Sequence, residues 1–220
     1  MKDTLKIDIV SDVVCPWCTV GYKHLQKAID ELNIADQVEI EWQPFELNPH
    51  MPAEGQDLTE HITQKYGSTK EQHEASRQRL VEAGANVDFT FDFYEGMRIV
   101  NTFDAHILLE YAKKFGKQTE LKMRLTTAYF SERKDVSKEE VLKEALLAVG
   151  LNADEALAKL QDDEARYEVQ SNKQHWQNLG VRSVPTIVFN RKEAVTGAQP
   201  IGVFKSILKE FTNSAEVKSE

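Results

Sequence analysis

The chain has 220 residues, 41% of them hydrophobic and 29% charged, which is typical of a soluble globular protein and excludes an intrinsically disordered one. Its 36 acidic and 27 basic side chains give a formal net charge of −9, so we expect neither a nucleic-acid nor a membrane partner. The first residues hold no uninterrupted apolar stretch typical of a secretory signal, and no segment approaches the ~18 apolar residues of a membrane helix, so we expect a cytoplasmic protein.

Residues 1–47 predict a strand, a helix and a second strand. Residues 5–10 alternate apolar and polar side chains and include β-branched residues, which favours a strand. Pro16 fits the first turn of a helix, where its fixed φ is already correct and no N–H is needed. Apolar residues then recur at helical spacing up to Asn33, and residues 38–45 alternate again as a second strand.

Residues 48–163 are predicted to form an inserted helical domain, which begins where two closely spaced prolines end the sheet pattern. Residues 137–140 fit a capping box, and Asn152 is a candidate N-cap. Phenylalanines alternate with polar residues over 88–93, which predicts a short extended stretch with its rings in the core. The expected helices cover residues 57–66, 70–83, 101–115, 117–132, 138–149 and 153–161.

The C-terminal part predicts two more strands between two helices, followed by a solvated tail at 214–220. These elements cover residues 164–179, 186–190, 194–196 and a last helix that follows Pro200. Residues 1–47 and 164–213 would then be two halves of one α/β domain. Neither half could bury both faces of its strands alone, so we expect them to share one sheet.

Cys15 and Cys18 are the only cysteines, and they lie at the first strand-to-helix junction. Two thiols at this spacing can form a disulfide, and a Cys-x-x-Cys beside a β-α-β pattern indicates thioredoxin-like redox chemistry. A helix N-terminus stabilises a thiolate, so we expect a lowered pKa for Cys15, the attacking sulfur. A more buried and protonated Cys18 would resolve the mixed disulfide. Asp12 is an opposing influence, because a nearby carboxylate raises the pKa of a thiol.

Two other interpretations of the cysteine pair remain open. A structural zinc site needs four ligands, but there is no second cysteine pair, and His24 and the other histidines show no ligand-like spacing. The cysteines could also be two incidental buried side chains. We expect no metal and no cofactor.

Val184 and Pro185 stand directly before the predicted strand at 186–190. An X-Pro bond in a tight turn at a strand start can be cis. A trans proline that ends a loop fits the same pattern, so the residues alone leave both isomers open.

Four separated motifs follow one another along most of the chain. They are Cys-Pro-Trp-Cys at 15–18, Asn-Thr-Phe-Asp-Ala-His at 101–106, Ser-Glu-Arg-Lys-Asp-Val at 131–136, and Gly-Val-Arg-Ser-Val-Pro-Thr at 180–186 with Gly-Ala-Gln-Pro at 197–200. Together they resemble the DsbA-like thioredoxin-fold oxidoreductases, in particular the cytosolic FrnE-type branch. The resemblance implies a thioredoxin fold interrupted by an all-helical domain, with dithiol–disulfide oxidoreductase or isomerase activity.

The same resemblance implies roles for individual residues. Pro185 would be cis and lie beside the redox pair, and the backbone of Val184 would pair with an extended substrate chain. Pro16 and Trp17, between the cysteines, would tune the thiolate, and Trp17 would shield the disulfide or contact substrate. His106 would face the redox site, where we expect it to pack or form hydrogen bonds.

We therefore hypothesise a cytoplasmic oxidoreductase or isomerase that exchanges disulfides with thiol- or disulfide-containing polypeptides and is recycled by glutathione or a thioredoxin-like system. The alternative is a glutathione-dependent isomerase or kappa-class glutathione transferase, although these fold relatives typically carry serine at the first motif position and lack the second cysteine. A noncatalytic chaperone-like binder is a lesser alternative. The sequence gives neither the oligomeric state nor the direction of net electron transfer.

Overall fold

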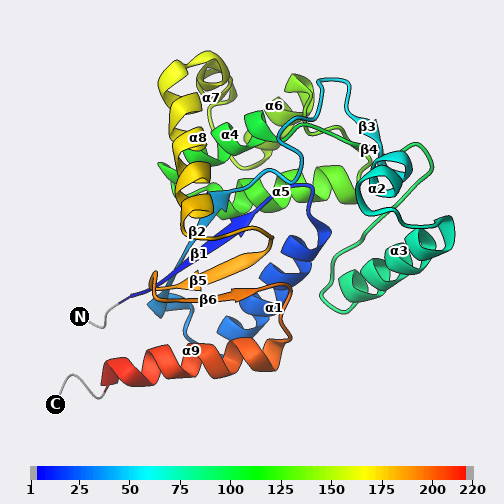
Figure 1. Ribbon diagram of the computed structural model, residues 1–220. Coiled ribbons are helices and arrows are strands. Elements are labelled where there is room, and N and C mark those ends of the chain that lie inside the picture. The colour runs from blue at the N-terminus through cyan, green and yellow to red at the C-terminus, as the bar shows by residue number, and fades with distance from the viewer. Residues whose placement is uncertain (1–3, 217–220) are drawn as a thin grey trace.

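The computed structural model describes residues 4–216, and a four-stranded sheet lies at its centre (Figure 1). The strand order is β2-β1-β5-β6. β1 (Leu5–Ser11) pairs in parallel with β2 (Val38–Pro44) and antiparallel with β5 (Thr186–Phe189), and β5 pairs antiparallel with β6 (Glu193–Thr196). The first and last parts of the chain therefore build one sheet, and the predicted α/β class is confirmed.

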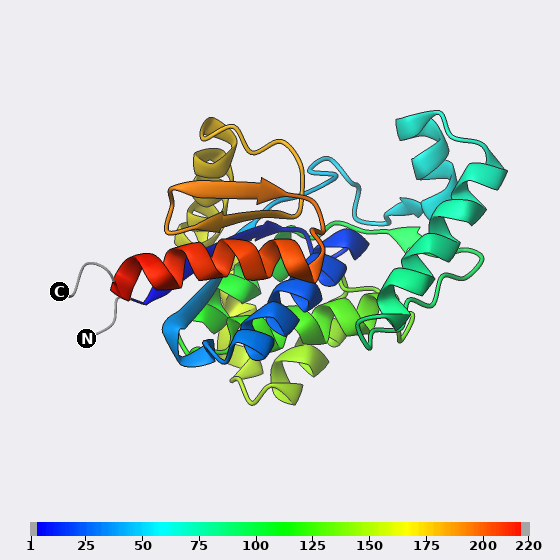
Figure 2. The same ribbon diagram turned by 90° about the horizontal axis from the view of Figure 1, so that it is seen from below.

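Two helices cover one face of this sheet: α1 (Pro16–Leu32) and α9 (Ile201–Glu216) (Figure 2). Pro16 is the first residue of α1, and Asn33 ends that helix in the left-handed conformation, as the sequence predicts. Alternate residues of β1 point into the shared core, which includes Ile7, Ile9, Leu25, Ile187, Phe204 and Leu208.

The opposite face of the sheet carries a smaller apolar cluster. Val10 and Val188 pack there against Trp176 of α8 (Asp163–Asn178). Both faces of the two central strands are therefore covered, which is why these strands contain almost no exposed side chains.

Between β2 and α8 the chain is mainly helical and has a hydrophobic core of its own. Its elements are β3 (Gln56–Asp57), α2 (Leu58–Tyr66), α3 (Lys70–Ala85), β4 (Arg98–Ile99), α4 (Phe103–Lys113), α5 (Gln118–Phe130), α6 (Glu139–Ala148) and α7 (Ala153–Ala158), with a short 3₁₀ turn at Lys159–Gln161. A second 3₁₀ turn, Ala35–Gln37, lies between α1 and β2. Leu108, Leu121 and Phe130 lie at its centre. Val13 and Val14, from the loop between β1 and α1, join this core and connect it to the cysteine pair.

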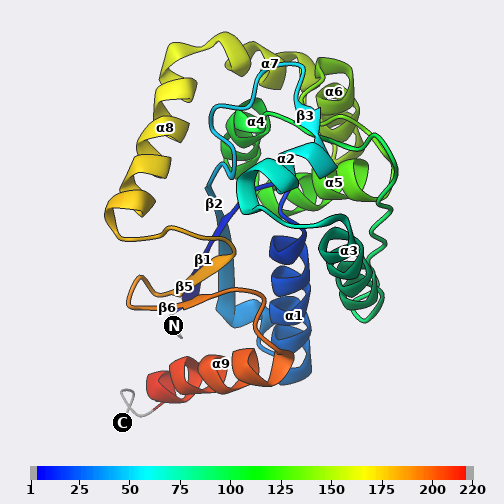
Figure 3. The ribbon, with the colours of Figure 1, turned by 45° about the vertical axis from the view of Figure 1, so that its right-hand side comes forward.

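α2 and α3 form a pair that lies beside the N-terminal half of α1 (Figure 3). A two-residue antiparallel ladder, β3 with β4, joins this pair to the remaining helices. Gly55 directly precedes β3 and has a φ of +68°, and a Cβ at this position would lie 2.4 Å from the Ile99 carbonyl oxygen. Only glycine fits this position without moving the backbone.

Most predicted helices are confirmed to within two or three residues, but one predicted cap is wrong. The Ser137 hydroxyl donates to the Asp135 carboxylate, so α6 begins at Glu139 without a side-chain cap. Asn152 caps α7 as predicted, by accepting from the Glu155 N–H. The sequence analysis missed the capping box of α3, which Thr69 forms with Gln72.

Two further segments differ from the sequence prediction. Residues 88–93 form no strand, although Phe89 and Phe91 are buried in the core as expected. α9 continues through Glu216, three residues into the segment predicted as a tail, and residues 217–220 lie outside the described part of the chain. Within residues 4–216, no helix is both long enough and apolar enough to cross a bilayer.

Gly21 in α1 packs closely against Pro185 and Ala198. A Cβ at this position would lie 3.2 Å from Pro185 Cγ and 3.3 Å from Ala198 Cα. Gly21→Val is therefore expected to lower the free energy of unfolding by about 1–3 kcal/mol, measured by urea denaturation.

Gly202 provides the matched control, because it also lies in a helix and a Cβ there would meet nothing within 4 Å. Gly202→Val should cost much less than Gly21→Val. Equal losses in the two variants would show that close packing against Pro185 is not the cause.

Candidate active site

The cysteine pair lies where β1 leads into α1. Cys15 is the N-cap of the helix and Pro16 occupies its first turn, and the Cys18 N–H donates to the Cys15 carbonyl at 3.1 Å. Both cysteines are free thiols. Cys15 is 5% exposed and Cys18 is 1% exposed, so Cys15 is the sulfur that a substrate can reach first.

The two thiols are hydrogen-bonded to each other, and their pKa values move apart. This hydrogen bond, burial and the charge of Asp12 raise the pKa of Cys15. Burial also disfavours the Cys18 thiolate, but the hydrogen bond from Cys15 and the charge of Lys122 outweigh it and lower the pKa of Cys18. The predicted lowered pKa of Cys15 is therefore wrong for the reduced pair. The two thiols are therefore coupled, and they ionise as a pair rather than independently.

Lys122, in α5, supplies the positive charge nearest to this pair. The residue is only 2% exposed, and no acceptor lies within hydrogen-bond distance of its Nζ among the described residues. Its ammonium lies 5.1 Å from the ring centroid of Trp42, on the ring face. Burial lowers the pKa of Lys122, whereas the adjacent Cys18, Asp12 and Cys15 favour its charged form. Asp12 and the two cysteines are therefore the groups whose negative charge acts on Lys122.

Asp12 and His106 hold the segment that follows β2 against the redox loop. Asp12 Oδ2 accepts from the Leu47 N–H at 2.7 Å, and His106 Nε2 donates to the Phe45 carbonyl at 2.9 Å. Asp12 Oδ1 lies 3.6 Å from His106 Nε2 and has no hydrogen-bond partner. Burial opposes ionisation of Asp12, but His106, the Leu47 N–H and Lys122 together lower its pKa. His106 thus has the hydrogen-bonding role expected from the sequence.

Val184 and Pro185 lie beside Cys15, and the peptide bond between them is cis, as the resemblance implies. The Val184 carbonyl oxygen is 3.9 Å from Cys15 Sγ. The Pro185 carbonyl accepts from the Gly197 N–H at 2.8 Å, which fixes this loop to the segment before α9.

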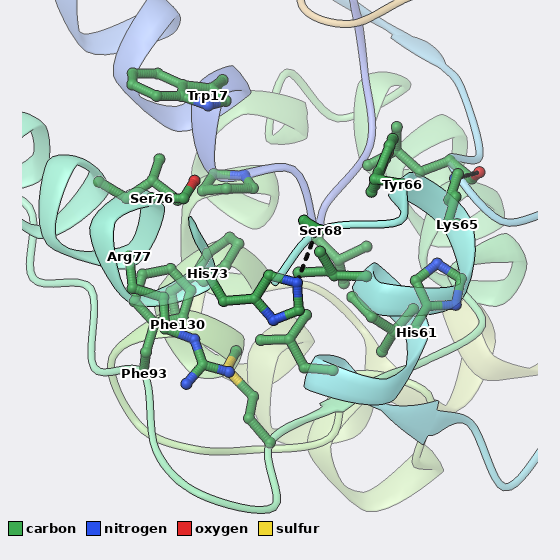
Figure 4. Close-up of a pocket in the computed structure, with 18 of the residues that line it drawn as sticks. Trp17, His61, Lys65, Tyr66, Ser68, His73, Ser76, Arg77, Phe93 and Phe130 are labelled. Atoms are coloured by element: carbon green, nitrogen blue, oxygen red, sulfur yellow. Dashed lines mark hydrogen bonds between the residues drawn. The ribbon is translucent and has the colours of Figure 1, made fainter. Parts of the chain in front are cut away.

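Pro16 and Trp17 face away from the buried charges. Both line a cavity of about 580 Å³ that lies between the first turn of α1 and the α2–α3 pair (Figure 4). Trp17 is 41% exposed, so its ring is available to an incoming molecule. Its predicted roles in shielding the disulfide and contacting substrate stay predictions.

The described residues contain no group of three or more His, Cys, Asp or Glu side chains arranged to hold a metal ion. His24 follows Cys18 in α1, but its Nδ1 lies 2.9 Å from the Gln199 carbonyl oxygen. His24 therefore points to the segment before α9.

Lys122 is the site residue that the sequence analysis missed. It lies on the buried face of α5, with Gln118, Leu125 and Tyr129 at helical spacing. A lysine on an otherwise buried face is the signal that could have identified it, because burial of an unpaired ammonium is costly. Its proximity to the cysteines depends on tertiary packing, which local spacing does not report.

Comparison with known proteins agrees with this geometry. Residues 6–209 match the family described as DSBA-like thioredoxin domain. The chain belongs to this family and is a DsbA-like oxidoreductase. The predicted thioredoxin fold with a helical insertion is consistent with this assignment.

Two solved structures and one sequence relative illustrate the similarity. A probable DsbA oxidoreductase from Streptomyces coelicolor is 32% identical, with a TM-score of 0.87 over 94% of this chain and 89% of that one. The cytosolic disulfide reductase DsbM from Pseudomonas aeruginosa, solved with GSH, is 15% identical, with a TM-score of 0.66 over 94% and 99%, and therefore shows the fold alone. The uncharacterized protein YwbO from Bacillus subtilis is 25% identical over 94% of this chain and 97% of its own length.

Replacing Lys122 tests its effect on the thiols. Lys122→Met keeps the packing against Trp42 but removes the charge, so we expect the first ionisation of the Cys15–Cys18 pair to shift upward by about one pH unit. The measurement is the rate of thiol alkylation as a function of pH. Lys143→Met, which removes an exposed lysine paired with Asp154, should leave the profile unchanged.

The same variant has a signature in protein stability. Burial lowers the pKa of Lys122 in the folded protein below its ordinary value of 10.5. At pH values between the folded-state pKa and 10.5, the unfolded chain therefore binds more protons than the folded protein. In this pH range the free energy of unfolding rises with pH. Lys122→Met should reduce this rise, measured by denaturation of the reduced protein at alkaline pH. An unchanged alkylation profile and an unchanged pH dependence of stability would together contradict the role assigned to Lys122.

Proposed function

We propose that this protein is a cytoplasmic thiol–disulfide oxidoreductase that exchanges disulfides with polypeptides. In the reducing direction, the Cys15 thiolate attacks a substrate disulfide, forms a mixed disulfide and releases one substrate thiolate. The Cys18 thiolate then attacks Cys15 Sγ, closes the Cys15–Cys18 disulfide and releases the second substrate thiolate. The substrate gains the two electrons that the cysteine pair loses, and reversal of both steps oxidises a substrate dithiol.

The observation that carries this proposal is the unequal accessibility of two hydrogen-bonded thiols at a helix N-terminus. Cys15 is the more exposed sulfur, whereas Cys18 lies deeper and nearer the charge of Lys122. When a disulfide approaches Cys15, ionisation of the pair followed by transfer of the remaining proton from Cys15 to Cys18 generates the attacking thiolate. The same proton leaves Cys18 for the departing thiolate in the second step.

The Val184 backbone is the proposed docking strand for the substrate. Its carbonyl lies beside Cys15 Sγ at the start of β5, where an extended chain could add main-chain hydrogen bonds. We propose that glutathione or a thioredoxin-like protein returns the cysteine pair to its starting state. Disulfide isomerisation would use the first step alone, followed by attack of another substrate thiol on the mixed disulfide.

Loss of the resolving thiol should trap the mixed disulfide. With Cys18→Ala, a peptide disulfide is expected to remain attached to Cys15, and multiple turnover should fall by at least about a hundredfold, because resolution then depends on external thiols. Intact mass spectrometry after acid quenching detects the adduct. Cys15→Ala is the matched control and should form no adduct.

Undiminished turnover by the Cys18→Ala variant would contradict the two-cysteine mechanism and favour glutathione-dependent chemistry at Cys15 alone. Binding of unfolded chains that persists in a variant lacking both thiols, without any exchange in the native protein, would instead favour the chaperone-like alternative.

The equilibrium between dithiol and disulfide gives the direction of electron transfer. In a series of glutathione redox buffers, alkylation followed by intact mass should show a two-electron transition of the Cys15–Cys18 pair. A midpoint potential of about −270 mV would indicate a reductant. A midpoint potential between about −180 and −120 mV would indicate an isomerase or an oxidant. Formation of only a glutathione adduct, with no internal disulfide, would overturn the proposed function.

A further inference from the structure

The cavity beside Trp17 has the size and lining of a binding site. Its volume of about 580 Å³ lies within the range of pockets that enclose small organic groups or peptide side chains. α2 and α3 form one side, and the start of α1 forms another (Figure 4). Much of its lining is apolar, including Val14, Leu80, Phe93, Met97 and Phe130.

The charges that line this cavity have one sign. Lys65, Arg77 and Arg79 all contribute, and no Asp or Glu is among the described lining residues, although the whole chain carries a net charge of −9. None of the three cations forms an ion pair within the described part of the chain. Several other basic side chains in the helical region are paired, as Arg133 is with Asp92 at 2.6 Å. The cavity therefore offers unneutralised positive charge to an anion.

Two polar atoms beside the cavity are buried without a partner. The His73 Nδ1 atom is one, in a residue that is only 6% exposed. The His73 Nε2 atom is 2.7 Å from the Ser68 hydroxyl, and either group can be the donor (Figure 4). In the tautomer in which Ser68 donates to Nε2, the ring proton lies on Nδ1, which is then a donor.

The Nε atom of Arg77 is the other, although the same side chain donates to Thr59 Oγ1 through its Nη2 at 2.9 Å. A buried donor without an acceptor destabilises the fold, and an oxygen of a bound ligand would supply the missing acceptor. Both donors come from α3 and both side chains line the cavity. The arrangement favours a ligand with an acceptor oxygen.

The cavity also lies next to the loop that carries the two cysteines. Val14 precedes Cys15, and Pro16 and Trp17 separate the two cysteines, so an occupant would contact the loop that holds the thiols. A substrate chain attached to Cys15 would pass this opening within a few residues of its own cysteine. Its neighbouring side chains could therefore enter the cavity while its sulfur is at the redox pair.

We propose that the cavity selects polypeptide substrates in which a large apolar residue lies next to an aspartate or glutamate close to the reactive cysteine. The apolar side chain packs between Trp17 and the α2–α3 pair, and the carboxylate accepts hydrogen bonds from Arg77 and His73. Lys65 and Arg79 add positive charge at the rim. This inference rests on the proposed function and specifies its substrate class.

Four disulfide-linked peptides of matched sequence test this selectivity, with Phe-Glu, Phe-Gln, Phe-Lys or Ala-Glu beside the cysteine. The readout is kcat/KM for disulfide exchange. We expect Phe-Glu to react about tenfold faster than Phe-Gln, since a charge-assisted hydrogen bond is about twice as strong as a neutral one, and Phe-Lys to react more slowly still. The Ala-Glu peptide should also lose rate, because it leaves the apolar part of the cavity unfilled.

Arg77→Met should abolish the preference for Phe-Glu over Phe-Gln, because it slows exchange with Phe-Glu more than exchange with Phe-Gln. Arg191→Met is the control, because Arg191 is an exposed arginine in the turn between β5 and β6 and does not line the cavity. Circular dichroism and thermal unfolding verify that both variants fold. Retention of the full Phe-Glu preference by Arg77→Met would overturn the assignment of the carboxylate to this residue.

A binding measurement that needs no redox chemistry separates the two proposals. The protein with both cysteines replaced by alanine should bind a Phe-Glu peptide with serine in place of cysteine more tightly than its Phe-Gln counterpart, by isothermal titration calorimetry. Such binding without exchange by the native protein would contradict the proposed function but not the cavity. Exchange with equal rates and equal binding for both peptides would overturn the cavity inference alone. If the protein binds phenylpropionate but neither peptide, the inference that the cavity takes part of a polypeptide is wrong.

Discussion

The ammonium of Lys122 beside two buried thiols is the interaction on which this site depends. A thiolate in a low-dielectric interior is unstable unless a cation or hydrogen-bond donors compensate its charge. Here the hydrogen bond between the sulfurs and the Lys122 charge supply that compensation, while Asp12 balances the lysine. Because Nζ has no hydrogen-bond acceptor, Lys122 costs the fold stability, and the surrounding apolar core of the helical region must offset this cost.

The redox site is consequently shared between parts of the chain that are far apart in sequence. The sheet supplies the loop with the cysteines and the Val184–Pro185 segment, whereas α5 and α4 supply Lys122 and His106. Asp12 and His106 also fix the segment after β2, and this segment leads directly to the α2–α3 pair. The stretch of chain after β2 thus connects two parts of the molecule. It is held by Asp12 and His106 beside the cysteines, and it continues into α2 and α3, which line the cavity.

Hydrophobic periodicity was sufficient to predict the sheet and nearly all helices, because these elements bury one face each and their pattern is local. The cysteine spacing likewise predicted that the two thiols lie together at the start of α1. Three features required tertiary information. Lys122 comes close to Cys18 only when α5 packs against the redox loop. That contact helps to lower the pKa of Cys18, whereas the sequence predicts a lowered pKa for Cys15. Ser137 donates to Asp135 instead of capping the helix that it was predicted to cap. The cavity also could not be predicted, because its walls come from five separate stretches of the chain.

The narrow connection between the α2–α3 pair and the remaining helices has an evolutionary consequence. Besides its packing against α1, this pair is joined by a ladder of two residues per strand, with Gly55 fitted against Ile99, and by buried contacts such as Gly84 against Phe91. Exposed residues of α2 and α3 can diverge without altering the sheet, the cysteine pair or Lys122, whereas the residues between the two strands that lie in the core, such as Phe91, cannot. Natural selection can thus change the surface that lines the proposed binding cavity while the cysteine pair is preserved.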